Sequence, residues 1–251
     1  MLRILHLTDP HLFAASDGEL RGVVTWESLN AVLDDYRDGG WAADLAIVTG
    51  DIVQDDSAAA YDRFRHGLIT LDLPVLCVPG NHDVDVLMRA VCTDPPFEYC
   101  TMSVHGGWLL AGLDSRVSGQ PGGEVAPAEF ERLHAAIRDS GAVHALVYLH
   151  HPPVPLGSDW LDEVGLANGP EALREFARTG HVRAVLFGHA HQAYDNTHNG
   201  LRVLGTPSTC RQFRPESPDF DVDDRPPGWR RLELTADGGI RTELAWTSRA
   251  S

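Results

Sequence analysis

The chain has 251 residues, of which 43% are hydrophobic and 22% charged, a composition typical of a folded globular protein. Its formal net charge is −16 and all 20 basic residues are arginines. Such acidity disfavours broad contact with nucleic-acid backbones or anionic membranes. No apolar run reaches the roughly 18 residues of a membrane-spanning helix. The opening stretch, MLRILHLTDPH, lacks a signal-peptide cleavage pattern, so we expect a cytoplasmic protein.

Five apolar segments predict buried strands, each ending in polar residues or glycine. They are residues 3–11, 43–51, 74–83, 143–153 and 182–191. Helical patterns lie between most of them, at 25–38, 57–71, 126–140 and 169–180. Thr25 is expected to cap the first of these helices. Strands that alternate with helices predict βαβ units, a mainly parallel sheet and an α/β fold.

Other segments favour antiparallel strands. Residues 97–117 predict a hairpin that turns at Gly106-Gly107, and 229–248 predict another that turns at Asp237-Gly238-Gly239. Residues 194–210 also have the pattern of antiparallel strands. The acidic, proline-rich loop 214–228 is expected to be a solvated flap without strands. We expect one domain over residues 1–251, with a tail and hairpin at 205–248.

Potential metal ligands follow all five predicted strands, and functional groups in α/β sheets gather beyond the carboxyl ends of strands. The motifs are Asp9-Pro10-His11, Gly50-Asp51, Gly80-Asn81-His82-Asp83, His150-His151 and Gly188-His189-Ala190-His191. Carboxylates and imidazoles that converge in a buried place need a metal or a partner. Nitrogen and oxygen donors without thiolate suit Mn, Fe, Zn, Ni or Co.

Seven of these residues are candidate ligands, too many for one tetrahedral ion. They are Asp9, His11, Asp51, Asn81, His150, His189 and His191. A shared carboxylate would let them hold two ions about 3.5–4 Å apart, the arrangement used for displacement at phosphorus. Asp9-Pro10-His11 alone would indicate only a turn, but five such motifs in order predict a metal centre.

The ordered set D-x-H, G-D, G-N-H-D, H-H-P-P and G-H-x-H resembles the calcineurin-like metallophosphoesterase superfamily. More narrowly, it is similar to the bacterial class III cyclic nucleotide phosphodiesterases. The later stretches GTPSTCRQF (205–213) and FDVDDRPPGWRRLEL (220–234) also resemble that subgroup. The resemblance implies a four-layer α/β/β/α sandwich, in which two mixed β-sheets are flanked by helices.

The resemblance also implies a role for each motif residue. One ion would be held by Asp9, His11 and His191. The other would be held by Asn81, His150 and His189, and Asp51 would bridge the two. His82 would face the substrate phosphate as a catalytic residue, either as a proton donor to the leaving ribose oxygen or as a group that neutralises charge in the transition state, with Asp83 steadying its ring. Asn81 and His151 are further candidates for substrate binding, and His151 is expected to lie behind the metal ligands.

The expected reaction is hydrolysis of a 3′,5′-cyclic nucleotide, cyclic AMP to AMP, by a hydroxide that bridges two metal ions. Iron and manganese are the expected metals, with zinc, cobalt or nickel as alternatives. The alternative function is a phosphoesterase of the same superfamily that acts on glycerophosphodiesters, 2′,3′-cyclic nucleotides or phosphomonoesters. A non-catalytic metal-binding scaffold is a remote alternative. The expected partner is a small molecule, not nucleic acid or membrane, and a homodimer is left open.

Most of the remaining residues of interest are expected to have structural roles outside the site. The histidines outside the motifs are expected to be surface or satisfied core groups: His6, His66, His105, His134, His144, His181 and His198. Cys77, Cys92, Cys100 and Cys210 are expected to be reduced and partly buried. Trp26 and Trp41 are expected to pack. Arg21 and Arg116 are expected to be solvated, and a contact with a phosphate or a dimer partner is the alternative. Gln212 and Phe213 are candidates for lining the nucleotide pocket.

Overall fold

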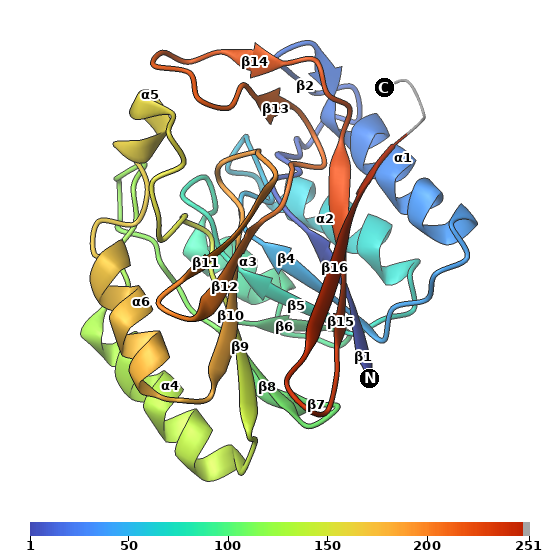
Figure 1. Cartoon of the computed structure of the whole chain (residues 1–251). Coiled ribbons are helices and arrows are strands. Elements are labelled where there is room, and N and C mark those ends of the chain that lie inside the picture. The colour runs from blue at the N-terminus through green and yellow to red at the C-terminus, as the bar shows by residue number, and fades with distance from the viewer. Residues whose placement is uncertain (248–251) are drawn as a thin grey trace.

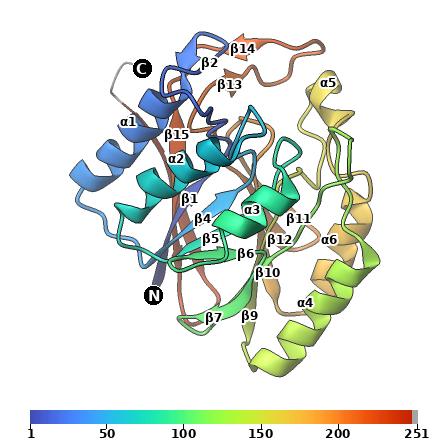
Figure 2. The same ribbon diagram turned by 180° about the vertical axis from the view of Figure 1, so that it is seen from behind.

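The computed structural model describes residues 1–247, which form two six-stranded sheets stacked face to face between helices (Figure 1). Helices α1 (Thr25–Asp38), α2 (Ala58–Ile69) and α3 (Asp85–Val91) cover one sheet, and α4 (Pro127–Ser140) and α6 (Gly169–Arg178) cover the other. The same layers are seen from behind in Figure 2. The predicted four-layer α/β/β/α sandwich is confirmed.

The first sheet has the order β16-β15-β1-β4-β5-β6. Its parallel strands are β1 (Leu2–Leu7), β4 (Leu45–Thr49), β5 (Val75–Val78) and β6 (Phe97–Tyr99). The hairpin of β15 (Gly228–Leu234) and β16 (Ile240–Trp246) adds antiparallel to β1. All residues of β4 and β5 are buried, as parallel strands covered on both faces require.

The second sheet has the order β11-β12-β10-β9-β8-β7. Its parallel strands are β8 (Trp108–Gly112), β9 (His144–Tyr148), β10 (Val182–Phe187) and β12 (Leu201–Gly205). Antiparallel strands close both edges, β7 (Met102–His105) and β11 (Tyr194–His198). Both sheets are therefore mixed.

Three buried apolar clusters hold the four layers together. Two lie between a sheet and its helices, and the third lies between the sheets and includes Ile4, Ile47, Trp108 and Tyr148. Because strand side chains alternate between faces, the residue two positions after Ile4, which is His6, also points into the layer between the sheets. Arg230 pairs with His6 across β1 and β15, and both are buried.

Several predicted boundaries need correction. The five strands end before their motifs; β1, for example, stops at Leu7. The N-cap of α1 is Val24 and Thr25 is already helical, so the predicted cap is wrong. Residues 97–117 are not one hairpin, because β6 joins the first sheet while β7 and β8 turn at Gly106-Gly107 in the second.

The loop 214–228 is not free of strands. Its β14 (Val222–Asp223) pairs with β13 (Gln212–Phe213), so the chain folds back beside the end of the sheets. A second short hairpin joins β2 (Glu19–Leu20) to β3 (Val23–Val24). The predicted hairpin at 229–248 is confirmed as β15–β16, although its last residue lies outside the described part of the chain. No helix within residues 1–247 has the length and apolarity to cross a membrane.

Candidate metal centre

The seven candidate ligands lie together where five strands of both sheets end. They follow β1, β4, β5, β9 and β10, which is the arrangement predicted for parallel strands that meet at one edge. In chain order they are Asp9, His11, Asp51, Asn81, His150, His189 and His191. All are buried except Asn81, which is partly exposed.

Asp9, His11 and His191 form one group. Nε2 of His191 lies 3.4 Å from Oδ1 of Asp9, and Nε2 of His11 lies 4.0 Å from the same oxygen. The two imidazole nitrogens are 3.1 Å apart. All three ligand atoms thus lie within the span that one metal ion could occupy.

Asn81, His150 and His189 form a second group. Oδ1 of Asn81 is 3.1 Å from Nε2 of His150 and 3.0 Å from Nδ1 of His189. Asp51 lies between the groups, with Oδ2 3.8 Å from Nε2 of His11 and 3.4 Å from Nε2 of His150. One carboxylate oxygen therefore reaches both groups, as a bridging ligand must.

Hydrogen bonds on the outer side of two rings fix which nitrogen faces the cluster as an acceptor. Nδ1 of His191 lies 2.6 Å from the carbonyl of Arg211, and Nδ1 of His150 lies 2.7 Å from the carbonyl of Thr49. Because a carbonyl only accepts, each Nδ1 donates, and Nε2 of the neutral ring points its lone pair inward. Those lone pairs face carboxylate and amide oxygens, so the donor set fits bound cations.

The backbone of five of these residues adopts the left-handed conformation, which L-residues with side chains rarely adopt. The φ angles lie between 47° and 62° at Asp9, His11, Asp51, His189 and His191. Such a conformation costs about 1–3 kcal/mol per residue. Gly188 completes the turn after β10, where a Cβ would lie 2.0 Å from Oγ1 of Thr8. The backbone is thus shaped around the ligands.

Protonation of the metal-free cluster follows from burial and contact. Burial lowers the pKa of His11 to about 4, so this ring is neutral near pH 7. Burial also acts to lower the pKa of His150, but the adjacent Asp51 carboxylate outweighs it and raises that pKa to about 9. A proton on His150 therefore takes the place of a cation beside Asp51, and a metal ion bound at this nitrogen would release it.

His82 and Asp83 differ in their surroundings. The His82 side chain is exposed, and its ring lies edge-on to His11 with centroids 5.1 Å apart. The Asp83 carboxylate instead accepts hydrogen bonds from the backbone of Gly80 at 2.8 Å and the hydroxyl of Tyr61 at 2.9 Å. The expectation that Asp83 steadies the His82 ring is wrong, since Asp83 is buried and braces the loop after β5.

His151 is fully buried behind the cluster. Its Nδ1 lies 2.8 Å from the hydroxyl of Ser115, and its Nε2 lies 3.2 Å from the carbonyl of Pro121. Both ring nitrogens therefore have protein partners. The geometry fits the position behind the ligands and contradicts the expected substrate contact, because a fully buried ring with both nitrogens engaged offers no polar atom to a substrate.

A cavity of about 290 Å³ opens beside the cluster and is lined by His11, Asp51, Asn81, His82, His189 and His191. The rest of its lining is largely apolar and includes three aromatic rings, Trp160, Phe213 and Phe220. Their centroids are 5.1–5.4 Å apart in edge-to-face contacts. We call these three residues the aromatic wall. It comes from α5 (Asp159–Asp162), β13 and the loop before β14.

Sequence reasoning found only part of this wall. Phe213 lines the cavity and stacks on His191 at 4.2 Å between centroids. Gln212 does not line it, because its side chain is buried and bonds to the backbone of Ser208. Trp160 and Phe220 were missed, since Trp160 lies in no motif or periodic segment and Phe220, although it begins the stretch 220–234, was given no role there.

Residues 2–193 match the calcineurin-like phosphoesterase family. The chain belongs to this family. The 3′,5′-cyclic adenosine monophosphate phosphodiesterase CpdA of Escherichia coli (strain K12) is 42% identical over 97% of this chain and 89% of its own length. The protein of the same name from Haemophilus influenzae is 37% identical over 97% and 89%.

Solved structures share the fold of this phosphoesterase at low identity. A dimetal phosphatase from Danio rerio superimposes with a TM-score of 0.65 at 14% identity, over 98% of this chain and 99% of its own. The two-sheet frame is therefore one on which a two-metal phosphatase is built.

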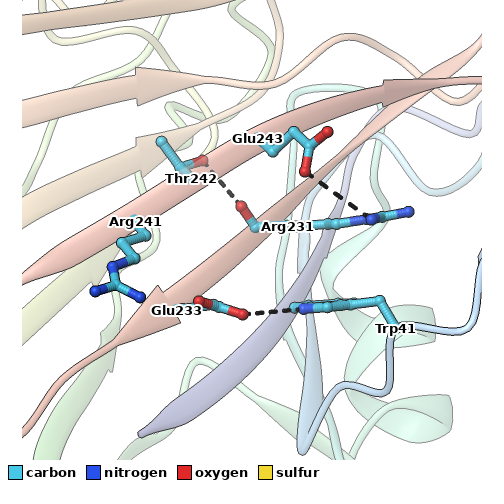
Figure 3. Close-up of a pocket in the computed structure, with 6 residues that line it drawn as sticks. All are labelled: Trp41, Arg231, Glu233, Arg241, Thr242 and Glu243. Atoms are coloured by element: carbon cyan, nitrogen blue, oxygen red, sulfur yellow. Dashed lines mark hydrogen bonds and ion pairs between the residues drawn. The ribbon is translucent and has the colours of Figure 1, made fainter.

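Two further regions of the phosphoesterase carry no site. Arg116 is not solvated as expected, since its guanidinium lies 2.7 Å from both Asp85 and Asp114 and its side chain is only 15% exposed. A cavity of about 210 Å³ lies over β15 and β16 (Figure 3). There Trp41 donates to Glu233 at 3.2 Å, and Arg231 lies 3.9 Å from Glu243. These groups pair with one another, so we assign no ligand to this cavity.

Proposed function

We propose that this protein is a metal-dependent phosphodiesterase that hydrolyses 3′,5′-cyclic nucleotides, cyclic AMP to AMP. The observation that carries the proposal is the single Asp51 oxygen within 3.8 Å of His11 and 3.4 Å of His150, at the mouth of a partly aromatic cavity. The 42% identity to a cyclic AMP phosphodiesterase over nearly the whole chain supports the substrate class.

The proposed ligands are Asp9, His11 and His191 for one ion, Asn81, His150 and His189 for the other, and Asp51 for both. Bound metal ions would act as Lewis acids that activate water and draw charge from the phosphoryl oxygens. Iron and manganese suit the mixed nitrogen and oxygen donors, with zinc, cobalt and nickel as alternatives. These ions would also supply the positive charge that an acidic chain otherwise lacks for an anionic substrate.

His82 is proposed as the catalytic group of the protein itself. It is exposed to the cavity, and its backbone N–H donates to Oδ1 of Asp51 at 2.9 Å, which fixes its position relative to the bridging carboxylate. An imidazole there can donate a proton to the ribose oxygen as the phosphodiester bond breaks. Substrate contact by Asn81 stays a proposal on the same ground, since its side chain also lines the cavity.

The aromatic wall supports a nucleoside substituent on the phosphate. Stacking of a base on aromatic rings contributes about 1–3 kcal/mol per base. Arg21 approaches the same wall, with its guanidinium 4.1 Å from the centroid of Phe220. The cavity is close to the lower limit of small-ligand pockets, about 300 Å³, which fits a mononucleotide.

Rates of hydrolysis of 3′,5′-cyclic AMP, 2′,3′-cyclic AMP, a glycerophosphodiester, bis-p-nitrophenyl phosphate and a phosphomonoester test the proposal. The protein is first freed of metal and then loaded with Mn²⁺ or Fe²⁺. We expect kcat/KM to be highest for 3′,5′-cyclic AMP. A higher value for the glycerophosphodiester or the monoester would contradict the proposed substrate while leaving the metal centre intact.

We also propose that the protein works in the cytoplasm. The four cysteines are free and all are buried, more completely than the partial burial expected. Free thiols fit a reducing compartment.

A further inference from the structure

A row of polar side chains crosses the apolar layer between the two sheets. Nε of Arg230 donates to Oγ1 of Thr206 at 3.1 Å, and that oxygen lies 2.7 Å from Nδ1 of His6. Nε2 of His6 lies 2.9 Å from Oγ1 of Thr49. All four residues are buried.

The row continues to the metal centre. Oγ1 of Thr49 lies 2.8 Å from Oγ1 of Thr8, which lies 2.6 Å from Oδ2 of Asp9. Five hydrogen bonds thus join a guanidinium on β15 to a proposed metal ligand after β1. We call this series of residues, from Arg230 to Asp9, the buried polar chain.

The direction of these bonds follows from the Asp9 end. An ionised carboxylate only accepts, so the single hydroxyl hydrogen of Thr8 points to Asp9. The Thr8 oxygen then accepts from Thr49, whose one hydrogen is thereby used. The Thr49 oxygen must in turn accept from Nε2 of His6. Burial and the nearby Arg230 lower the pKa of His6 to about 3, so the neutral ring carries its only N–H on Nε2.

The Arg230 end requires the same direction independently. A guanidinium only donates, so Thr206 accepts from Nε of Arg230 and its own hydrogen is available for Nδ1 of His6. With Nε2 as its donor, His6 has a lone pair on Nδ1 to receive that hydrogen. Both arguments place the N–H of His6 on Nε2. Every hydrogen in the series therefore points toward Asp9.

Arg230 lies in an unusual environment for a charged side chain. Its side chain is almost completely buried, and its hydrogen bonds go to Thr206, Thr242 and the carbonyls of Tyr194 and Gly205. None of these acceptors carries a charge. Burial lowers the pKa of Arg230 to about 10, so the group stays charged near pH 7. A buried cation bonded to neutral acceptors is costly, and the charge of the nearby Asp195 offsets part of that cost.

We propose that Arg230, Thr206 and His6 are positioning residues that act through Thr8 and Thr49 on Asp9. The buried polar chain ends on Oδ2 of Asp9, and the backbone N–H of His189 lies within hydrogen-bond distance of both carboxylate oxygens, 3.0 Å from Oδ2 and 3.1 Å from Oδ1. Because the side chains of the series bind only Oδ2, Oδ1 faces His191, whose Nε2 lies 3.4 Å away. This inference rests on the proposed role of Asp9 as a metal ligand.

The proposal also gives the C-terminal part of the chain a part in the site. The family match ends at residue 193, whereas Thr206 and Arg230 lie beyond it. Strand β15 therefore does more than extend the first sheet, because its Arg230 is joined to Asp9 by five hydrogen bonds through four side chains.

Substitutions of two threonines test the inference. Thr206→Val keeps the shape but breaks the series, whereas Thr206→Ser keeps the hydroxyl. Thr242→Val is the matched control, because it removes a different hydrogen bond of Arg230, 3.0 Å long, outside the series. Mn²⁺ binding to the metal-free proteins is measured by electron paramagnetic resonance of free Mn²⁺. We expect Thr206→Val to weaken one of two binding constants by about 10–100-fold, and Thr206→Ser and Thr242→Val to bind as wild type.

A second readout does not depend on metal. In ¹⁵N-edited spectra of the metal-free protein, His6 should be the Nε2–H tautomer, and Thr206→Val should change its nitrogen shifts while Thr242→Val leaves them. Equal Mn²⁺ binding by Thr206→Val and Thr242→Val, or an Nδ1–H tautomer of His6, would overturn the inference. Failure of the wild type to bind two Mn²⁺ ions would instead overturn the proposed metal centre.

Discussion

The proposed metal cluster and the aromatic wall line one cavity but are built differently. Proposed ligands such as Asp51 and His150 follow fully buried parallel strands, and their side chains are almost inaccessible. The wall comes from short elements and loops, and Phe220 is 42% exposed. The proposed ligands, which must keep their geometry, are thus positioned by buried strands. The aromatic residues, which only need to cover a substrate, lie on short elements and loops.

The largest effect is expected at the cluster. Asp51→Asn weakens the bridge between both groups, so turnover should fall by about 10³-fold or more, or at least 4 kcal/mol in barrier. Metal content by elemental analysis and cyclic AMP hydrolysis are measured together. Asp56→Asn, an exposed carboxylate of the same loop, is the control. Retention of a tenth of the wild-type rate by Asp51→Asn would remove the bridging role.

Substitution of His82 should lower the rate of hydrolysis by a factor that depends on the leaving group. His82→Ala should keep both metal ions, yet lose about 10²–10⁴-fold on cyclic AMP, because a ribose oxygen needs a proton to leave. Bis-p-nitrophenyl phosphate has a good leaving group and should be affected much less. Equal losses on both substrates, with metal content verified, would show that His82 is not a proton donor.

A smaller and more selective effect is expected at the aromatic wall. Phe220→Ala should lower kcat/KM for cyclic AMP by about 10-fold, within the 1–3 kcal/mol of one stacking contact. Activity on bis-p-nitrophenyl phosphate, which has no base, and the metal content should stay close to wild type. An equal loss of activity on both substrates would show that Phe220 supports the metal cluster. It would contradict the separate roles of the cluster and the aromatic wall.

A further effect concerns the stability of the metal-free protein. Burial lowers the pKa of His6 and of His151 to about 3 and that of His11 to about 4, so these histidines bind fewer protons in the folded chain than in the unfolded chain below pH 6.5. Their contribution to the free energy of unfolding should therefore fall as pH drops below 6.5, by up to about 1.4 kcal/mol per pH unit for each histidine. Two groups oppose this, Asp83, with its pKa raised to about 6 by burial, and His150, with its pKa raised to about 9 by Asp51, but the three histidines outweigh them. Urea unfolding at pH 7 and pH 5 measures the difference, and equal values would contradict it.

The metal cluster was also the part of the cavity that the sequence could predict. A buried strand followed by a polar motif is a local pattern, and five repetitions placed residues such as Asp9 and His191 together without knowledge of the sheet order. The short β6 was misplaced because Phe97–Tyr99 and the following β7 lie in different sheets, a choice made by long-range pairing.

Only Phe213 of the aromatic wall was predicted, because the contacts of Trp160 and Phe220 depend on where loops meet. Trp160 belongs to a four-residue helix and Phe220 to a proline-rich loop, so no periodicity marks either. Asp83 was misjudged for a related reason: the sequence shows its neighbour His82 but not Tyr61, which lies on another helix and binds it at 2.9 Å. His6 was interpreted as a satisfied core group, and only the geometry shows what its two bonds connect.

The left-handed backbone at the ligands has a consequence for protein engineering. Glycine adopts positive φ without steric penalty, so His11→Gly or His191→Gly would relieve local strain in the metal-free chain while removing a ligand. A laboratory selection for heat resistance alone, carried out without metal, would therefore favour glycine substitutions at the proposed metal ligands. Such a library should be screened for bound metal before it is screened for melting temperature.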